Sequence, residues 1–214
     1  MGIITGRLIG SGRASDVYEI DDAWVLRRAR DAYSDALAEA AVMERVRGHG
    51  YPVPRVRVED CSSTELVMER LHGPTMLGAF AAGRIDAEEA GVVLARLLRR
   101  LHALPGRVVH LDLHPDNVML TPAGPYVIDW ANAEEGDPGL DWGMSAVILA
   151  QVAVGDETFA EPARAMLAAL LADASSLTDD GLAEARRRRA VNPTMSRREV
   201  ELLGAAEDLI RSLT

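Results

Sequence analysis

The stretch VHLDLHPDNV at residues 109–118, followed by VIDW at residues 127–130, decides how the whole chain is interpreted. Polar residues alternate with leucine and valine in the first stretch, which is unusual for a plain surface loop. Asp129 directly follows a run typical of a buried strand, so its carboxylate needs a cation or hydrogen bonds. Together, Asp112, Asn117 and Asp129 offer hard oxygen ligands and a candidate base. That combination favours Mg²⁺ over zinc.

On the N-terminal side of this stretch, the pattern of apolar residues predicts a region rich in strands. One helix is predicted there at residues 34–47, in which Leu37, Ala41, Val42 and Val46 recur at helical spacing. Short runs of valine, isoleucine, leucine or tyrosine predict strands at residues 3–10, 16–20, 23–28, 56–59 and 65–68. Proline and glycine near residue 50 end the helix.

The rest of the chain is predicted to be mainly helical. Asp86 and Glu89 form the capping-box pattern of a helix that reaches about residue 104, and further helices are predicted at 140–154, 158–173, 178–190 and 197–212. A hairpin of two short strands, 118–120 and 126–128, interrupts them. We therefore expect an α+β fold, with a β-rich lobe at residues 1–70 and a helical lobe at residues 71–214.

The composition narrows the classes of function. The chain has 214 residues, with 23 basic and 33 acidic side chains and a formal charge of −10, which argues against a nucleic-acid or anionic-membrane partner. Cys61 is the single cysteine, so a disulfide framework is excluded. No apolar run reaches the roughly 18 residues of a membrane span, and the N-terminus does not resemble a signal peptide. We expect a soluble, cytoplasmic protein. All of its basic residues are arginines.

Residues 109–130 resemble the catalytic loop and metal-binding aspartate of the protein-kinase-like superfamily. The form His-x-Asp-x-His-Pro-x-Asn with Ile-Asp-Trp is closer to aminoglycoside phosphotransferases and related small-molecule kinases than to protein kinases. The resemblance implies a bilobal kinase-like fold in which Asp112 deprotonates an acceptor hydroxyl. It implies that Asn117 and Asp129 hold Mg²⁺ against the phosphates of ATP. It also makes His114 a candidate catalytic residue near the transferred phosphate.

Earlier segments resemble the nucleotide-binding parts of the same superfamily. The run GSGRASDV at residues 10–17 resembles a glycine-rich loop with Ser15 in place of the third glycine. The resemblance implies phosphate or adenine contacts for the following residues: Gly10, Ser11, Gly12, Val17 and Val25. Arg27 stands where the superfamily has a phosphate-binding lysine, and Glu39 resembles its acidic partner, with Glu44 as the alternative. The Glu69 carbonyl and the Leu71 N–H would bind adenine.

Three further features have structural interpretations. Asp141 resembles the residue that braces the backbone of the catalytic loop in this superfamily. His102, at the end of a predicted helix, is expected to pack in the core. The arginine run 186–189 is expected to be an exposed helix end beside acidic residues rather than a binding patch.

Three other functions compete with the phosphotransferase. His110, Asp112 and His114 could bind the metal of a metallohydrolase, but no further histidine follows them. A regulated protein kinase is disfavoured because residues 130–140 contain no serine, threonine or tyrosine and no Ala-Pro-Glu follows. Arg27 favours a pseudokinase that binds nucleotide without transfer, whereas the intact Asp112 opposes it.

The sequence thus predicts an ATP- and Mg²⁺-dependent phosphotransferase that acts on a hydroxyl group of a small molecule. The alternative is a pseudokinase-like nucleotide-binding or regulatory module. The identity of the acceptor, the choice between ATP and GTP and the oligomeric state stay open.

Overall fold

The computed structural model describes residues 5–12, 14–30, 35–155, 158–172 and 176–214. Arg13 of the glycine-rich segment and the ends of three predicted elements, at residues 3–4, 34 and 173, lie outside the described residues. Packing divides the chain into two compact units. The first unit comprises residues 1–73 and 119–133, and the second comprises residues 74–118 and 134–214.

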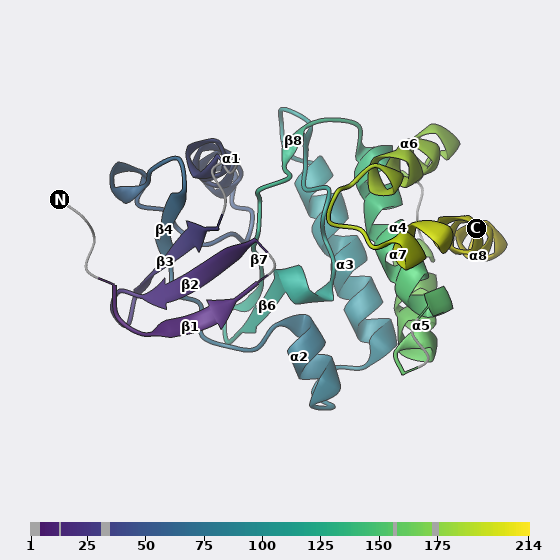
Figure 1. Cartoon of the computed structure of the whole chain (residues 1–214), viewed down its shortest axis with the longest axis horizontal. Coiled ribbons are helices and arrows are strands. Elements are labelled where there is room, and N and C mark those ends of the chain that lie inside the picture. Colours follow the sequence, from purple (N-terminus) through teal and green to yellow (C-terminus); the bar gives the residue numbers. More distant parts are fainter. Residues whose placement is uncertain (1–4, 13, 31–34, 156–157, 173–175) are drawn as a thin grey trace. The chain divides into compact units, whose positions relative to one another are not determined.

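An antiparallel sheet of four strands forms the body of the first unit (Figure 1). Its strands are β1 (Leu8–Ser11), β2 (Ser15–Glu19), β3 (Trp24–Ala29) and β4 (Glu65–Glu69), which pair in the order of the chain. Leu26 of β3 lies opposite Val67 of β4, and both side chains are fully buried. This register places Val25 and Arg27 together on the other face of β3, because side chains alternate along a strand.

Helix α1 (Ala36–Gly48) and a hairpin complete the first unit. The helix begins at Asp35, whose carboxylate accepts a hydrogen bond from the Ala38 N–H. The hairpin consists of β6 (Val118–Thr121) and β7 (Gly124–Val127). Trp130, which follows the hairpin, is buried and packs edge-on against Tyr51, with the ring centroids 5.6 Å apart.

The strand predicted at residues 56–59 is largely wrong. Val56 forms a single bridge to Met68 of β4, and the Arg57 N–H donates to the Val67 carbonyl. The chain then turns into a 3-10 helix, η1 (Val58–Asp60), closed by a hydrogen bond from the Asp60 N–H to the Arg57 carbonyl. That turn takes the backbone away from the sheet, so the pairing ends at residue 57.

The second unit is mainly helical. Its longest helices are α3 (Ala87–His102) and α4 (Pro138–Gly155), and Asp86 caps α3 as predicted, by accepting from the Glu89 N–H at 2.7 Å. The remaining elements are α2 (Met76–Ala81), α5 (Ala160–Leu171), α6 (Asp179–Ala190), α7 (Arg197–Glu201) and α8 (Leu203–Leu213), the 3-10 helix η2 (Pro115–Asn117) and the two-residue strands β5 (Val108–Val109) and β8 (Glu134–Glu135). The observed architecture is α+β, as predicted.

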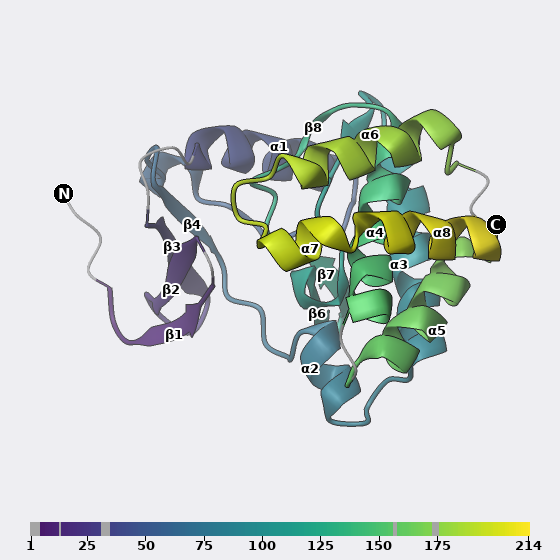
Figure 2. The same cartoon turned by 45° about the vertical axis from the view of Figure 1, so that its right-hand side comes forward.

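Helix α4 is the centre of this unit and contacts α5, α6 and α8 (Figure 2). The packing is close enough to require glycine at two crossings. A Cβ atom on Gly91 of α3 would lie 2.3 Å from the Met166 carbonyl oxygen of α5, and one on Gly181 of α6 would lie 2.4 Å from the Gly139 carbonyl oxygen of α4. Among the described residues, no helix combines the length and the apolar character that crossing a membrane requires.

Candidate functional site

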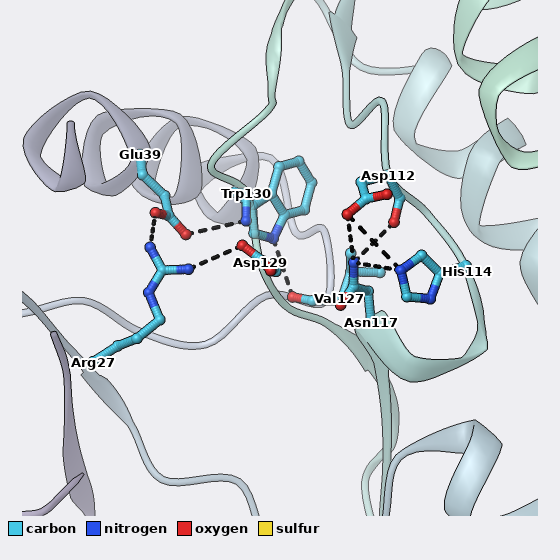
Figure 3. A network of polar contacts seen from close by, with 8 residues as sticks. All are labelled: Arg27, Glu39, Asp112, His114, Asn117, Val127, Asp129 and Trp130. Atoms are coloured by element: carbon cyan, nitrogen blue, oxygen red, sulfur yellow. Dashed lines mark hydrogen bonds and ion pairs between the residues drawn. The ribbon is translucent and has the colours of Figure 1, made fainter. Parts of the chain in front are cut away.

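Asp112 and Asn117 face each other across the turn that joins β5 to η2 in the second unit (Figure 3). The Asn117 side-chain Nδ2 lies 2.9 Å from the Asp112 carbonyl oxygen and 3.3 Å from the Asp112 Oδ2. Asn117 is buried, whereas the Asp112 side chain keeps 26% of its surface exposed. The amide therefore fixes one oxygen of the Asp112 carboxylate, while part of the side chain stays in contact with solvent. Together with His114, these residues form the loop cluster.

His114 lies close to both Asp112 and Asn117. Its Nε2 atom is 3.2 Å from the Asn117 Nδ2 and 3.8 Å from the Asp112 Oδ2. Its Nδ1 atom is 3.3 Å from the Asp116 N–H, which it caps at the start of η2. A neutral imidazole has only one acceptor nitrogen, so the ring accepts from one of these two N–H groups at a time. His114 is therefore close enough to interact electrostatically with the Asp112 carboxylate.

Asp141 of α4 braces the backbone of the loop, which confirms the predicted role. Its carboxylate is fully buried and accepts hydrogen bonds from the Leu111 N–H at 2.7 Å and the His110 N–H at 2.9 Å. Leu111 has a φ of 63°, which is uncommon for a residue with a side chain. The two hydrogen bonds hold this unfavourable conformation directly before Asp112.

His102 packs in the core as predicted, and it also contacts Asp141. Its Nε2 atom lies 2.9 Å from the Asp141 Oδ2, and its side chain is 8% exposed. Sequence reasoning missed this contact, because the two residues are far apart in the chain and no local pattern links them.

The metallohydrolase alternative does not fit the loop. His110 is fully buried, and its Nδ1 lies 3.2 Å from the Asp112 N–H, so that nitrogen is engaged with the backbone. Within the described ranges, no group of three or more histidine, cysteine, aspartate or glutamate side chains is arranged to hold a metal ion.

A second set of polar contacts lies in the first unit and joins Arg27 of β3, Glu39 of α1, Asp129 and Trp130 (Figure 3). The Arg27 Nη2 forms an ion pair with the Glu39 Oε2, and its Nη1 lies 3.0 Å from the Asp129 Oδ1. The Trp130 N–H donates to the Glu39 Oε1 at 3.1 Å. We call these four residues the Arg27 ring, because Trp130 directly follows Asp129 and so closes the circuit. The other candidate partner, Glu44, contacts Arg47 instead, at 3.0 Å.

Glu39 is an acid buried in the core of the first unit, with 4% of its surface exposed. Burial raises the pKa of its carboxyl group, the Arg27 charge opposes that effect, and the nearby Asp129 charge adds to it. Arg27 therefore offsets part of the effect of burial on the pKa of Glu39. A buried acid with a perturbed pKa beside a single cation is typical of functional sites.

The glycine-rich segment forms the turn between β1 and β2. The Gly12 N–H donates to the Ser15 carbonyl at 2.9 Å, and Val17 lies opposite Gly10 in the sheet. A Cβ atom on Gly10 or Gly12 would make only ordinary contacts, at 3.6 and 3.7 Å. The fold itself therefore does not demand glycine at either position. This fits a backbone that a phosphate group approaches closely.

Hydrogen bonds between polar side chains stabilise the same turn. The Ser11 Oγ donates to the Asp16 Oδ1 at 2.8 Å, and the Arg30 Nη2 lies 2.5 Å from both of these oxygen atoms. Arg30 and Ser11 hold the pKa of the Asp16 carboxyl below its usual range. The turn is thus fixed from the end of β3.

The predicted adenine-binding residues lie at the end of β4. Glu69 is its last residue and pairs through its side chain with Arg55 at 3.2 Å. No described residue accepts a hydrogen bond from the Leu71 N–H. Val25, on the same face of β3 as Arg27, is buried. All of these residues lie in the first unit.

The two predicted metal ligands both present an oxygen atom. Asn117 is oriented with its nitrogen toward Asp112, and no described residue donates to its Oδ1. Asp129 contacts Arg27 through Oδ1, and its Oδ2 accepts no hydrogen bond from the described part of the chain. Mg²⁺ prefers such carboxylate and amide oxygens, so the donor set of each residue fits this ion.

The arginine run 186–189 lies at the end of α6 and contacts nearby acidic residues, as predicted. Arg186 pairs with Glu207, Arg187 and Arg188 pair with Glu184, Arg188 also pairs with Glu134, and Arg189 donates to Gln151. Three of the four arginines thus lie beside glutamates, which fits a helix end next to acidic residues.

Comparison with known proteins points to one family. The profile of the "Phosphotransferase enzyme family" matches residues 5–108 and, in a second match, residues 77–189. The two matches overlap and together cover most of the chain. They confirm the resemblance found in residues 109–130.

Two curated proteins are similar to part of the chain. One is the death-associated protein kinase dapk-1 of Caenorhabditis elegans, 32% identical over 109 residues, which are 47% of this chain and 8% of that protein. The other is the EKC/KEOPS complex subunit BUD32 of Chaetomium globosum, 31% identical over 116 residues, which are 48% of this chain and 43% of that protein. The chain therefore spans less than half the length of these relatives.

Proposed function

This chain belongs to the phosphotransferase enzyme family, and on that premise we propose that it transfers the γ-phosphoryl group of ATP, with Mg²⁺, to a hydroxyl group of a small molecule. The acceptor is an aminoglycoside-like compound or another alcohol. A kinase-like activity in general is supported by the family and by both relatives. The reaction forms a bond between the acceptor oxygen and the γ-phosphorus and breaks the bond to the β,γ-bridging oxygen.

The single observation that carries the proposal is the setting of Asp112. Its carboxylate is held by the Asn117 amide and remains partly exposed, and the loop before it is braced by a buried Asp141. A carboxylate held in this way can orient the acceptor hydroxyl and accept its proton as the oxygen attacks phosphorus. His114, within 3.8 Å of the same carboxylate, would steady its charge.

The nucleotide would be bound mainly by residues of the first unit. The phosphates would be covered by the turn that contains Gly10, Ser11, Gly12 and Val17. Adenine would be held by Val25 and by the backbone of Glu69 and Leu71. Arg27 would contact the phosphates while Glu39 orients it. Asn117 and Asp129 would ligate Mg²⁺, which when bound neutralises charge on the phosphates. Rate enhancement would then come from positioning and from charge stabilisation.

Arg27 is the observation that favours a second candidate, a pseudokinase-like module that binds nucleotide without transfer. Arginine keeps the charge of the usual lysine but is a planar fork rather than a point donor. Both of its η nitrogens contact carboxylates, those of Asp129 and Glu39. The two candidates differ in what the loss of Asp112 does, since a binding module does not need a base.

The test is a screen of ATP consumption and of new phosphate monoesters by ³¹P NMR, over aminoglycosides, macrolides, amino alcohols and sugars. We expect one class to be phosphorylated, and the variant Asp112→Asn to lose turnover by about 10²–10⁴-fold while still binding ATP. Asp116→Asn is the matched control, because this exposed aspartate lies in the same turn but outside the loop cluster. Equal turnover in Asp112→Asn and the native protein would remove Asp112 as the base. Binding of Mg·ATP without transfer to any acceptor would favour the pseudokinase.

A further inference from the structure

The Arg27 ring is a closed circuit of contacts within the first unit (Figure 3). It runs from the Asp129 Oδ1 to the Arg27 Nη1, then from the Arg27 Nη2 to the Glu39 Oε2. From the Glu39 Oε1 it returns to the Trp130 N–H and so to the residue next to Asp129. Each carboxylate oxygen of Glu39 therefore has its own donor.

The ring includes Asp129, whose backbone conformation is unfavourable. Asp129 has a φ of 61°, in the left-handed region that residues with a side chain rarely adopt. Such a conformation persists only where the surroundings determine it. Here Arg27 holds the side chain of Asp129, and Glu39 holds the peptide N–H that follows it.

Trp130 anchors the far side of the same turn. Its indole Nε1 donates to the Val127 carbonyl at 3.1 Å, its ring is 1% exposed, and it packs edge-on against Tyr51. The indole is therefore a sensitive reporter of the backbone around Asp129. A change in the ring would reach Trp130 through its own N–H.

The chemistry of arginine suits the central position of the ring. A guanidinium group presents five N–H donors in a rigid plane, and separate nitrogens can therefore serve separate carboxylates. The Arg27 side chain is 11% exposed, so it has little freedom to choose other partners. A lysine offers one nitrogen, which would have to reach Glu39 and Asp129 at once.

We propose that Arg27 is a positioning residue that holds Asp129 in its left-handed conformation, and that this task requires the two η nitrogens of an arginine. The consequence for catalysis rests on the proposed function, in which Asp129 ligates Mg²⁺. The ring itself lies within the first unit and can be measured without turnover.

The experiment uses the full chain labelled with 5-fluorotryptophan and observed by ¹⁹F NMR without nucleotide. The chain has three tryptophans, of which Trp142 in α4 serves as the internal reference, and Trp130→Phe assigns the Trp130 signal. The variants are Arg27→Lys, Arg27→Gln and Glu39→Gln. The matched control is Arg28→Gln, which changes the next residue of β3; Arg28 lies on the opposite face and pairs with Glu65.

We expect each ring variant to displace the Trp130 signal by more than its linewidth, while the Trp142 signal stays in place and Arg28→Gln leaves Trp130 unchanged. An unchanged Trp130 signal in Arg27→Gln would overturn the ring. If Arg27→Gln does not fold, the same comparison is made with Arg27→Lys and Glu39→Gln. An unchanged Trp130 signal in both variants would then overturn the ring. A displaced signal in Arg27→Gln but a native one in Arg27→Lys would overturn the requirement for arginine.

A second readout links the ring to the metal. Calorimetric titration of ATP with Mg²⁺ into Arg27→Lys should show weaker binding than titration into Arg28→Gln. If the native protein binds no Mg·ATP, the proposed function fails, and the ¹⁹F result still decides the ring. The two failures are therefore distinguishable.

Discussion

Asp141 is the residue with the clearest structural task in the chain. One fully buried carboxylate accepts hydrogen bonds from two backbone N–H groups and from the ring of His102. The sequence predicted the brace from the position of Asp141 after Asp129 in a family-like segment. It could not predict the His102 contact, which depends on how α3 and α4 pack.

The substitution Asp141→Asn tests this brace. The amide nitrogen of asparagine would face a backbone N–H and leave a buried donor unpaired, so the free energy of unfolding should fall by about 1–3 kcal/mol. Urea unfolding followed by circular dichroism measures it. Asp137→Asn, at the exposed start of α4, should change it much less. Equal effects of the two substitutions would show that the brace contributes nothing.

Glu39 shows where residue-level prediction reached its limit. The sequence left Glu39 and Glu44 both open as partners of Arg27, because spacing alone does not say which face of a helix meets a strand. The apolar pattern pointed to Leu37, yet Leu37 is 45% exposed and Glu39 is buried. A charged residue on the buried face is the departure that marks a functional position.

At the scale of elements, most helices follow from local patterns. The helix predicted at 140–154 is α4, and the one at 178–190 is α6, both within two residues of the prediction. The two-residue strands β5 and β8 were not predicted, because Val108 pairs with Glu135 far along the chain. Local periodicity carries no information about such a pairing.

Helix α6 provides a prediction about pH. Contacts with Arg187 and Arg188 lower the pKa of Glu184 from its usual 4.5 to about 2. Since the folded pKa lies below the unfolded one, the contribution of Glu184 to stability is present above pH 4.5 and is lost as the pH falls toward 2. Glu184→Gln should therefore lose less stability than the native protein between these values.

Thermal unfolding at a series of pH values measures this difference. Glu201→Gln is the control, because Glu201 forms a similar ion pair with Arg197 in α7 at 2.9 Å but is more exposed. The control should keep the native slope of unfolding temperature against pH. A native slope in Glu184→Gln as well would contradict the assignment.

At the scale of the whole molecule, chain order and packing do not coincide. Residues 119–133 pack with the first unit although much of the second unit precedes them in the sequence. Asp129 and Arg27 belong to the first unit, and Asp112 belongs to the second. The fold class followed from patterns and from the family-like motifs, whereas this return of the hairpin depends on long-range packing.

Phosphoryl transfer by this chain would require that it bind Mg·ATP, and isothermal titration calorimetry tests this binding without knowledge of the acceptor. ATP is titrated into the native protein with and without Mg²⁺, into Asp129→Asn, and into Asp116→Asn as the control. We predict binding that requires Mg²⁺ and that weakens about tenfold or more in Asp129→Asn, about 1.4 kcal/mol, but not in Asp116→Asn. No binding of ATP, or binding that is independent of both Mg²⁺ and Asp129, would rule out the proposed Mg²⁺-dependent phosphoryl transfer.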